Sequence, residues 1–590
     1  MSSKSWVKVS LSAVLTASLT ACAQSPGITT PASSQPQATQ TAQTIQAPEA
    51  SVSTSTQKKN ELTSQVLYQF LLGEIASQRG ELKLSAEAYA DLAARTQDAR
   101  VAKRATELAL HARLSSLALK NARLWYSLES GSAKATQTLA SLLVSSGHLS
   151  EAKPILQAWL KSAGDGKAAD GKAFMQLHGL MAKQKDKQAA YDFMAEVLRD
   201  FPSVPEAHFA LAQSAWGAGN ALKALAELDE VMRLKPGWEA APLFKAQILQ
   251  QEGGDADALA FFQKYLADWP DEREIRLAYA KLLARTSSFA DSRKQFEWLA
   301  KEMPDNPENH LAIGLIAMQT EDLDSAEASI SKALQLGHPD EGGVRYHLGQ
   351  LAEIRERLED ALTWYQSVQK GRVFDAKLRT AILLNKLGRT EQAQDVLTGL
   401  QPNDDAARVQ LVLTEALIMR ESKDYAAVVA VLTKALEKLP DNPDLLYDRA
   451  MAAEKLNRLD MVEADLRKLI KLKPDYAHAY NALGYTLADR TVRIAEALDL
   501  LETAIKLDPD DPFIQDSMGW ALFKAKRYEE ALDYLWRAHK AKADPEIAAH
   551  LGETLWAAGK KAEARQIWEA ALKKHPENES LRETTSRLLP

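Results

Sequence analysis

Residues 546–576 read EIAAHLGETLWAAGKKAEARQIWEAALKKHP, two short amphipathic helical patterns joined at a glycine and closed by a proline. The pattern is defined by Leu551, Gly552, Leu555, Gly559, Ala564, Trp568 and Ala571. Residues 207–236 repeat it at the same spacing, with Leu211, Ala212, Ala215, Gly219, Ala224, Leu228 and Val231. Because small and large residues recur in one order, a helical hairpin is the repeating unit of the chain.

Prolines mark the period of this unit. They recur every 34 residues at Pro202, Pro236, Pro270 and Pro304, and again between Pro440 and Pro474. The small residues have a physical role, since two helix axes approach closely only where the side chains between them are small. Glycines at the turn between the two helices suit a left-handed residue that ends the first helix. These turn glycines are Gly219, Gly253, Gly388 and Gly559.

This period and residue pattern resemble the tetratricopeptide repeat, and the resemblance covers about residues 62–576, or about fifteen units. It implies an all-α fold, a superhelical solenoid whose first helices line an inner face. Units before residue 203 keep the spacing but have lost part of the pattern. The segment SLRETTSRLL at 580–589 is predicted to be a final helix that covers the apolar edge of the last unit.

The first residues predict that the protein is exported and anchored in a membrane. Lys4 and Lys8 precede a run of apolar and small residues at 9–21, which has the length of a secretory signal and is too short to span a bilayer. The run ends Leu19-Thr-Ala-Cys22, which resembles a bacterial lipobox, and Cys22 is the only cysteine of the chain. The resemblance implies acylation of Cys22, and Ala23 after it implies an outer-membrane lipoprotein whose array faces the periplasm. Several acyl chains together anchor a protein firmly.

The sequence thus predicts five segments. They are a lipoprotein signal peptide at 1–21, the lipidated cysteine and a disordered linker at 22–60, degenerate repeats at 61–202, regular repeats at 203–576 and a capping helix at 577–590. The linker is rich in Ser, Thr, Gln, Pro and Ala and nearly free of large apolar groups. Such a composition cannot bury enough surface to fold, so the linker acts as a spacer.

The chain carries no recognisable catalytic set. Its eleven histidines are scattered without a metal-binding spacing. Its net charge of −7 argues against binding to the phosphate backbone of nucleic acid. Residues 166–172 match a phosphate-binding loop for seven places, but Ala173 stands where a hydroxyl is needed for magnesium. We therefore expect no enzyme activity, no metal and no cofactor, and predict that the protein acts by binding other proteins.

By the pattern of the family, set positions of each first helix face the inner groove. In the last three units the candidate partner-binding residues at these positions are Asn481, Tyr485, Asp489, Asp516, Trp520, Lys524, Glu553 and Trp556. Aromatic rings beside charged groups suit recognition of a peptide or protein. For Trp520 and Trp556 an alternative stays open, in which the rings pack between units.

The C-terminal third has a narrower resemblance. The runs 480–490, 516–520 and 549–556 look like long outer-membrane lipoproteins of proteobacteria, at least one of which is an adaptor of a periplasmic carboxy-terminal processing protease. That resemblance implies recruitment of such a protease and presentation of its substrates, which include cell-wall hydrolases. The alternative function is a structural or export component of an envelope secretion machine. The sequence leaves the oligomeric state open and makes the degenerate N-terminal units a second candidate surface.

Overall fold

The computed structural model describes residues 63–162 and 171–589, which form 31 α-helices and no β-strand. Thirty of these helices, α2 to α31, form fifteen consecutive pairs, and α32 follows the last pair. The prediction of an all-α array of about fifteen helical hairpins is therefore confirmed. Cys22, the linker and the glycine-rich residues 166–170 lie outside the described residues.

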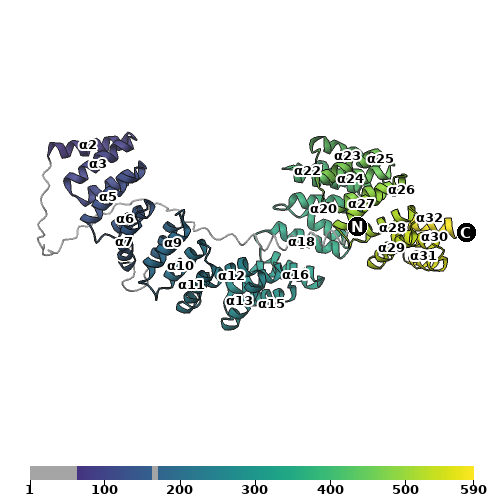
Figure 1. Ribbon diagram of the computed structural model, residues 1–590, viewed down its shortest axis with the longest axis horizontal. Helices are drawn as coiled ribbons and strands as arrows, with labels where there is room; N and C mark the ends of the chain where they lie inside the picture. The colour runs from purple at the N-terminus through teal and green to yellow at the C-terminus, as the bar shows by residue number, and fades with distance from the viewer. Residues whose placement is uncertain (1–62, 163–170, 590) are drawn as a thin grey trace. The chain divides into compact units, whose positions relative to one another are not determined.

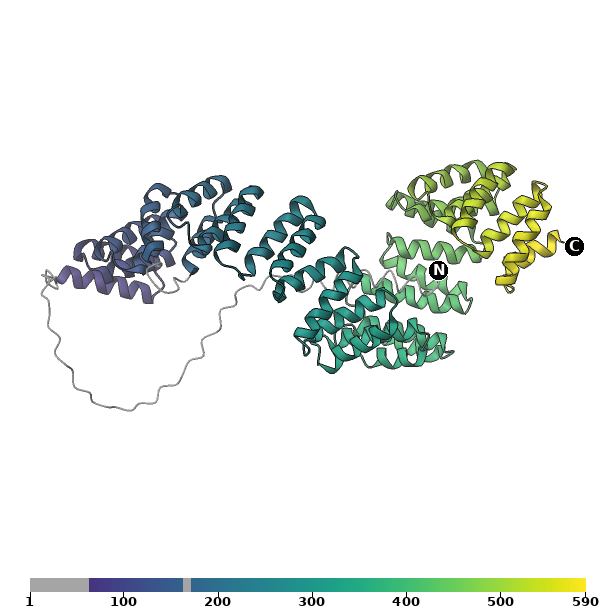
Figure 2. The same ribbon diagram turned by 90° about the horizontal axis from the view of Figure 1, so that it is seen from below.

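The chain divides into two compact units between Ser329 and Ile330, inside α17 (Leu323–Gln335). In each unit the helix pairs follow one another in chain order (Figure 1, Figure 2). Every substantial contact between helices joins elements that are one or two apart in the sequence. Each unit is thus a row of neighbour interfaces.

The first unit contains α2 (Ser64–Gln78), α3 (Leu82–Thr96), α4 (Ala99–His111), α5 (Ser115–Leu128), α6 (Ala133–Ser145), α7 (Leu149–Ser162), α8 (Lys172–Met181), α9 (Lys187–Leu198), α10 (Pro205–Gly217), α11 (Ala221–Leu234), α12 (Ala240–Gly253), α13 (Asp255–Asp268), α14 (Arg273–Arg285), α15 (Phe289–Glu302) and α16 (Pro307–Gln319).

The second unit contains α18 (Glu341–Ile354), α19 (Leu358–Gln366), α20 (Val373–Lys386), α21 (Thr390–Thr398), α22 (Asp405–Glu421), α23 (Tyr425–Lys438), α24 (Pro443–Lys455), α25 (Leu459–Leu472), α26 (Ala477–Arg490), α27 (Ile494–Leu507), α28 (Pro512–Lys524), α29 (Tyr528–Ala541), α30 (Pro545–Ala557), α31 (Lys561–Lys574) and α32 (Glu579–Leu588).

Small residues mark the points where paired helices touch. A Cβ atom added to Gly519 in α28 would lie 2.5 Å from Leu535 Cγ and 3.1 Å from the backbone oxygen of Ala531, both in α29. A Cβ on Gly484 in α26 would lie 2.6 Å from Leu501 Cγ in α27. Contacts below 3 Å leave no room for a side chain, so the expected close approach of the two helices is confirmed here.

Most of the described turns between paired helices contain a left-handed residue. It is glycine at Gly219 and Gly559, with φ of +78° and +86°, as the sequence predicts. After α12 the left-handed residue is Gly254 and not Gly253, because the helix continues through Gly253. Elsewhere a non-glycine residue takes this conformation, as at Asn457 with φ of +56°. A left-handed turn therefore forms at several pairs without a glycine, whereas the turns after α8 and α26 contain no left-handed residue.

Polar side chains cap the N-terminal ends of several helices. Asn306, Asn442 and Asp511 each precede a proline in the first helical turn and accept a hydrogen bond from a backbone N–H of that turn. The Asp511 carboxylate accepts two, at 2.8 and 2.9 Å. A cap of this kind typically contributes about 1 kcal/mol to helix stability.

The C-terminal end of the array is closed by α32. This helix packs against α30 and α31, and Leu581 within it is fully buried. Its outer positions are polar, as the run Arg582-Glu583 illustrates. A polar outer face is what the terminal element of a repeat array needs.

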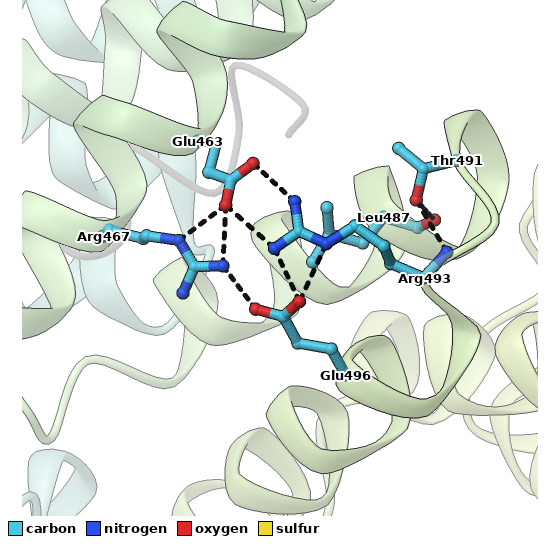
Figure 3. A network of polar contacts seen from close by, with 6 residues as sticks. All are labelled: Glu463, Arg467, Leu487, Thr491, Arg493 and Glu496. Carbon is cyan, nitrogen blue, oxygen red and sulfur yellow. Dashed lines mark hydrogen bonds and ion pairs between the residues drawn. The ribbon is translucent and has the colours of Figure 1, made fainter.

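A network of arginines and glutamates joins α25 to the start of α27 (Figure 3). Arg493 donates to Glu463 at 2.8 Å and to Glu496 at 2.6 Å, and Arg467 binds the same two carboxylates. The backbone N–H of Arg493 donates to Thr491 Oγ1 at 3.0 Å, which fixes the turn from which the arginine extends. The groups are exposed to solvent, which screens their charges, so each pair adds little to stability. The network ties second helices of adjacent pairs.

Candidate partner-binding face

The predicted site residues lie on three first helices, α26, α28 and α30, which we call the first-helix face. Contacts join α26 to α28 and α28 to α30, so equivalent positions on the three helices are neighbours in space. Figure 1 shows these helices at the C-terminal end of the chain. The repeat therefore brings residues about 34 positions apart in sequence to one surface.

Trp520 is a packing residue. Its indole is 7% exposed, stacks on Phe523 at 4.8 Å and on the ring of His550 in α30 at 4.2 Å. The indole N–H donates to Asp489 Oδ1 in α26 at 3.0 Å. The sequence left two roles open for Trp520, and the structure shows that it packs between successive helix pairs. Trp520 therefore has little surface to offer a partner.

Asp489 and Lys524 form an ion pair beside this tryptophan. Lys524 Nζ lies 3.2 Å from Asp489 Oδ1 and 4.8 Å from the centre of the Trp520 ring. Burial opposes the ionisation of Asp489, but the hydrogen bond from Trp520 and the charge of Lys524 outweigh it, so its pKa lies below the ordinary value. The Lys524 side chain keeps about a third of its surface exposed, so its charge is accessible from outside.

Asp516 lies beneath the face and binds a histidine that the sequence reading did not single out. Its Oδ2 is 2.9 Å from His550 Nδ1, while its Oδ1 is buried without a hydrogen-bond partner. Burial disfavours the charged imidazole, but Asp516, with Glu546 and Asp489 beyond it, outweighs this and raises the pKa of His550. Asp516 and His550 are 34 residues apart, one repeat, and this spacing is the signal that could have identified the pair.

Tyr485 and Asn481 are half-buried on α26. The Tyr485 ring lies 6.1 Å from that of His550. Burial, together with the carboxylates of Asp489 and Asp516, raises the pKa of Tyr485 well above its ordinary range, so its hydroxyl stays protonated and can donate. The amide oxygen of Asn481 is buried without a partner.

Glu553 and Trp556 extend the face along α30. Glu553 Oε2 accepts from Arg587 of α32 at 2.7 Å, which ties the terminal helix to this face. Trp556 is half-buried, packs against Trp568 at 5.8 Å and has Lys561 Nζ 4.9 Å from its ring centre. Trp556 thus combines packing with exposure, and its role toward a partner stays a prediction.

One exposed aromatic residue on α28 adds to the predicted set. Phe513 is 37% exposed, and the ammonium of Lys542 lies 4.1 Å from its ring centre. The tryptophans of the second helices differ from one another. Trp568 is fully buried, whereas Trp536 in α29 is 41% exposed.

Within the described residues no group of three His, Cys, Asp or Glu side chains is arranged to hold a metal ion. No helix in those same residues is both long and apolar enough to cross a membrane. The chemistry that the first-helix face offers is aromatic contact, hydrogen bonding and ion pairing. These are the interactions by which proteins recognise other proteins.

Comparison with known proteins agrees with this architecture. Models of the tetratricopeptide repeat match residues 174–237, 311–375, 443–476, 463–512 and 522–588. The chain is 34% identical over 499 residues to the TPR repeat-containing protein PA4667 of Pseudomonas aeruginosa, covering 84% of this chain and 83% of that protein. It is 25% identical over 117 residues to a small glutamine-rich tetratricopeptide repeat-containing protein of Mycosarcoma maydis. That match covers 20% of this chain and 33% of the relative.

Among solved structures, yeast Tom70 matches 76% of this chain and 100% of its own, with 15% identity and a TM-score of 0.37. The same family is indicated by the helix pairs with small residues at their contacts and by the similarity to the Pseudomonas protein. This chain belongs to the tetratricopeptide-repeat proteins.

Proposed function

We propose that this protein is a scaffold, anchored in the outer membrane through Cys22, that binds a periplasmic protein with its first-helix face. The partner we propose is a carboxy-terminal processing protease, to which the array also presents cell-wall hydrolases as substrates. The observation that carries the binding role is the array of fifteen helix pairs, which repeats side chains at equivalent positions of successive first helices. The anchor and the protease come from the sequence resemblances.

The accessible side chains of the face suit a protein partner. Phe513, Trp556 and Lys524 keep exposed surface, and each is held in place by a neighbour within the chain. Aromatic rings that are already fixed lose little conformational entropy on binding, which makes them efficient anchors. The ring of Trp520 and the buried pair beneath it act as the rigid support.

Substitution of single tryptophans tests whether the first-helix face binds the partner. We expect Trp556→Ala to weaken recovery of the partner at least about tenfold, since a buried aromatic anchor typically contributes 2 kcal/mol or more. Trp536→Ala removes an equally large ring from second helix α29 and should leave recovery unchanged. The measurement is affinity capture of the mature lipoprotein from detergent-solubilised membranes, with bound proteins quantified by mass spectrometry.

The identity of what is captured decides between functions. Enrichment of a protease and of cell-wall hydrolases supports the adaptor. Enrichment of secretion or assembly components without a protease would favour the alternative function, and equal losses in both tryptophan variants would remove the first-helix face from the proposal.

The anchor makes a separate prediction. Cys22→Ser removes the thiol that acylation needs, so we expect the chain to move from the membrane fraction to the soluble fraction of a cell fractionation. The helical array lies after residue 62, and its circular dichroism and thermal midpoint should not change. A Cys22→Ser protein that stays with the membrane would show that something other than lipid holds it there.

A further inference from the structure

The first helix of the described chain, α2, has an apolar outer surface. Fifteen large apolar side chains are exposed in the described residues, and five of them lie on this one helix. They are Leu67, Tyr68, Phe70, Leu71 and Ile75, exposed by 42%, 65%, 44%, 47% and 48%. We call these five residues the α2 patch. Scattered single apolar residues are ordinary on a surface, but a cluster on one helix marks a contact.

The position of α2 at the start of the described array explains why no other described helix covers the patch. The helix packs on α3 through the buried residues Gly73 and Ala76, and the Phe70 ring at the edge of the patch also contacts Tyr89 of α3 at 6.2 Å. A Cβ on Gly73 would lie 2.6 Å from the Tyr89 ring, so this side is filled by the chain itself. In the interior of the array a helix has neighbours before and after it, whereas no described helix precedes α2.

The other end of the chain shows what a covered end looks like. There a single helix, α32, lies on α30 with its apolar residue Leu581 fully buried and its polar residues outward. The α2 end has the apolar surface but no corresponding helix among the described residues. One further amphipathic helix would complete the α2 end as α32 completes the other.

Size and charge limit what that helix belongs to. The exposed part of the α2 patch amounts to on the order of 500 Å² for five large side chains, below the roughly 800 Å² per partner of a standard stable interface. An area of that size suits one docked helix better than a dimer of two arrays. The helix contains no basic residue and one acidic residue, Glu74, so it lacks the Lys and Arg that bind a helix to an anionic membrane.

Residues 23–60, which precede the array once the predicted signal peptide is removed, are a poor candidate for this helix. Between residues 23 and 60 the only large apolar residues are Ile28, Ile45 and Val52, separated by 17 and 7 positions. A stripe that covers α2 needs apolar residues three and four apart over at least two turns. The segment therefore cannot supply the complementary surface.

We propose that the α2 patch is the docking site of an amphipathic helix from a partner protein, which extends the array by one element at its N-terminal end. The bound helix presents Leu, Ile or Phe side chains at positions i, i+3, i+4 and i+7 to the patch, with its polar side outward as in α32. This proposal rests on the proposed scaffold function and assigns it a second contact surface, apart from the first-helix face.

Photo-crosslinking from the full-length protein tests the occupant. Tyr68 is replaced by p-benzoylphenylalanine in cells that make the protein natively, and the crosslinked peptide is sequenced by mass spectrometry. We expect an adduct with one foreign protein, mapped to a segment with helical apolar spacing. The same probe at Leu222, which is 85% exposed on α11, is the matched control and should give no such adduct. A crosslink to a second copy, to residues 1–62 of the same chain or to lipid, or no adduct at all, overturns the proposal.

A charge substitution gives an independent readout of the same contact. Leu71→Glu is expected to lower the yield of the Tyr68 crosslink at least tenfold, because docking would bury the new carboxylate without a partner. Leu222→Glu is the control, and both positions are exposed, so folding should be kept and is checked by circular dichroism. An unchanged yield in the Leu71→Glu protein contradicts helix docking.

A third probe position separates this proposal from the scaffold function. The photo-crosslinker at Phe513 reports on the first-helix face. Adducts from Phe513 without adducts from Tyr68 would leave the scaffold function standing and refute the α2 patch. Adducts from neither position would refute both.

Discussion

Replacing Gly519 by leucine is expected to unfold the end of the second unit. The first atom of the new side chain would lie 2.5 Å from Leu535 Cγ and 3.1 Å from the backbone oxygen of Ala531, and the backbone cannot move without separating α28 from α29. Forcing extra carbons into a filled contact typically costs about 1–3 kcal/mol, and a rigid backbone neighbour places this site at the upper end. Hydrogen exchange in α28 to α32 is the measurement, with protection expected to fall in this region first.

Gly179 provides the matched control. It also lies within a helix, α8, but a Cβ there meets no atom within 4 Å. Gly179→Leu should therefore leave protection unchanged or raise it slightly, since glycine in a helix is less favourable than other residues by roughly 0.5–1 kcal/mol. Equal loss of protection in the two variants would show that helix contact is not what requires glycine at 519.

The second large effect concerns the buried pair of His550 and Asp516. His550→Leu removes the only hydrogen-bond partner found for the Asp516 carboxylate among the described residues, so a charge is left buried and unpaired. Breaking such a pair from one side typically costs about 3–5 kcal/mol. We expect a lower midpoint of urea unfolding and lost protection in α28 and α30.

The double variant Asp516→Leu with His550→Leu tests the cause. Because both polar groups are then absent, it should be more stable than His550→Leu alone by at least about 1 kcal/mol, although the stacking of Trp520 on the imidazole is lost. A double variant as unstable as the single one would mean that shape, and not charge, decides the stability of this contact.

The same pair predicts a dependence on pH. The folded pKa of His550 is raised above its ordinary value of 6.5, so the pair's contribution is complete below about pH 6.5 and declines as pH rises through the folded pKa. The groups that produce the shift are Asp516, Glu546 and Asp489. Protection of α28 and α30 should thus decrease toward alkaline pH in the natural chain, and this component should be absent in the double variant.

The sequence predicts the repeat well because the repeat is a packing requirement. Gly484, Gly519 and Gly552 are small where helices touch, and the period that brings them together is visible without a structure. The turn after α12 shows the limit of this reasoning. Either Gly253 or Gly254 could end the helix, and the hydrogen bonds of the last helical turn, not the residue type, decide for Gly254.

The roles of individual side chains on the face were harder to predict. Trp520 and Trp536 are the same residue type in adjacent helices, yet one is 7% exposed and the other 41%. The difference comes from neighbours 31 and 30 residues away from Trp520 in the sequence, Asp489 and His550, which close over its ring. Burial of this kind depends on the geometry between successive helix pairs, which a repeat pattern does not encode.

The arrangement of contacts in the second unit also determines how the array carries load. Since substantial contacts join only helices one or two apart, a force applied between α18 and α32 passes through every neighbour interface in turn. Interfaces in series share the same force while their extensions add. The unit therefore behaves as springs in series, in which every contact contributes to the extension, and stretching first opens the contact that yields at the lowest force.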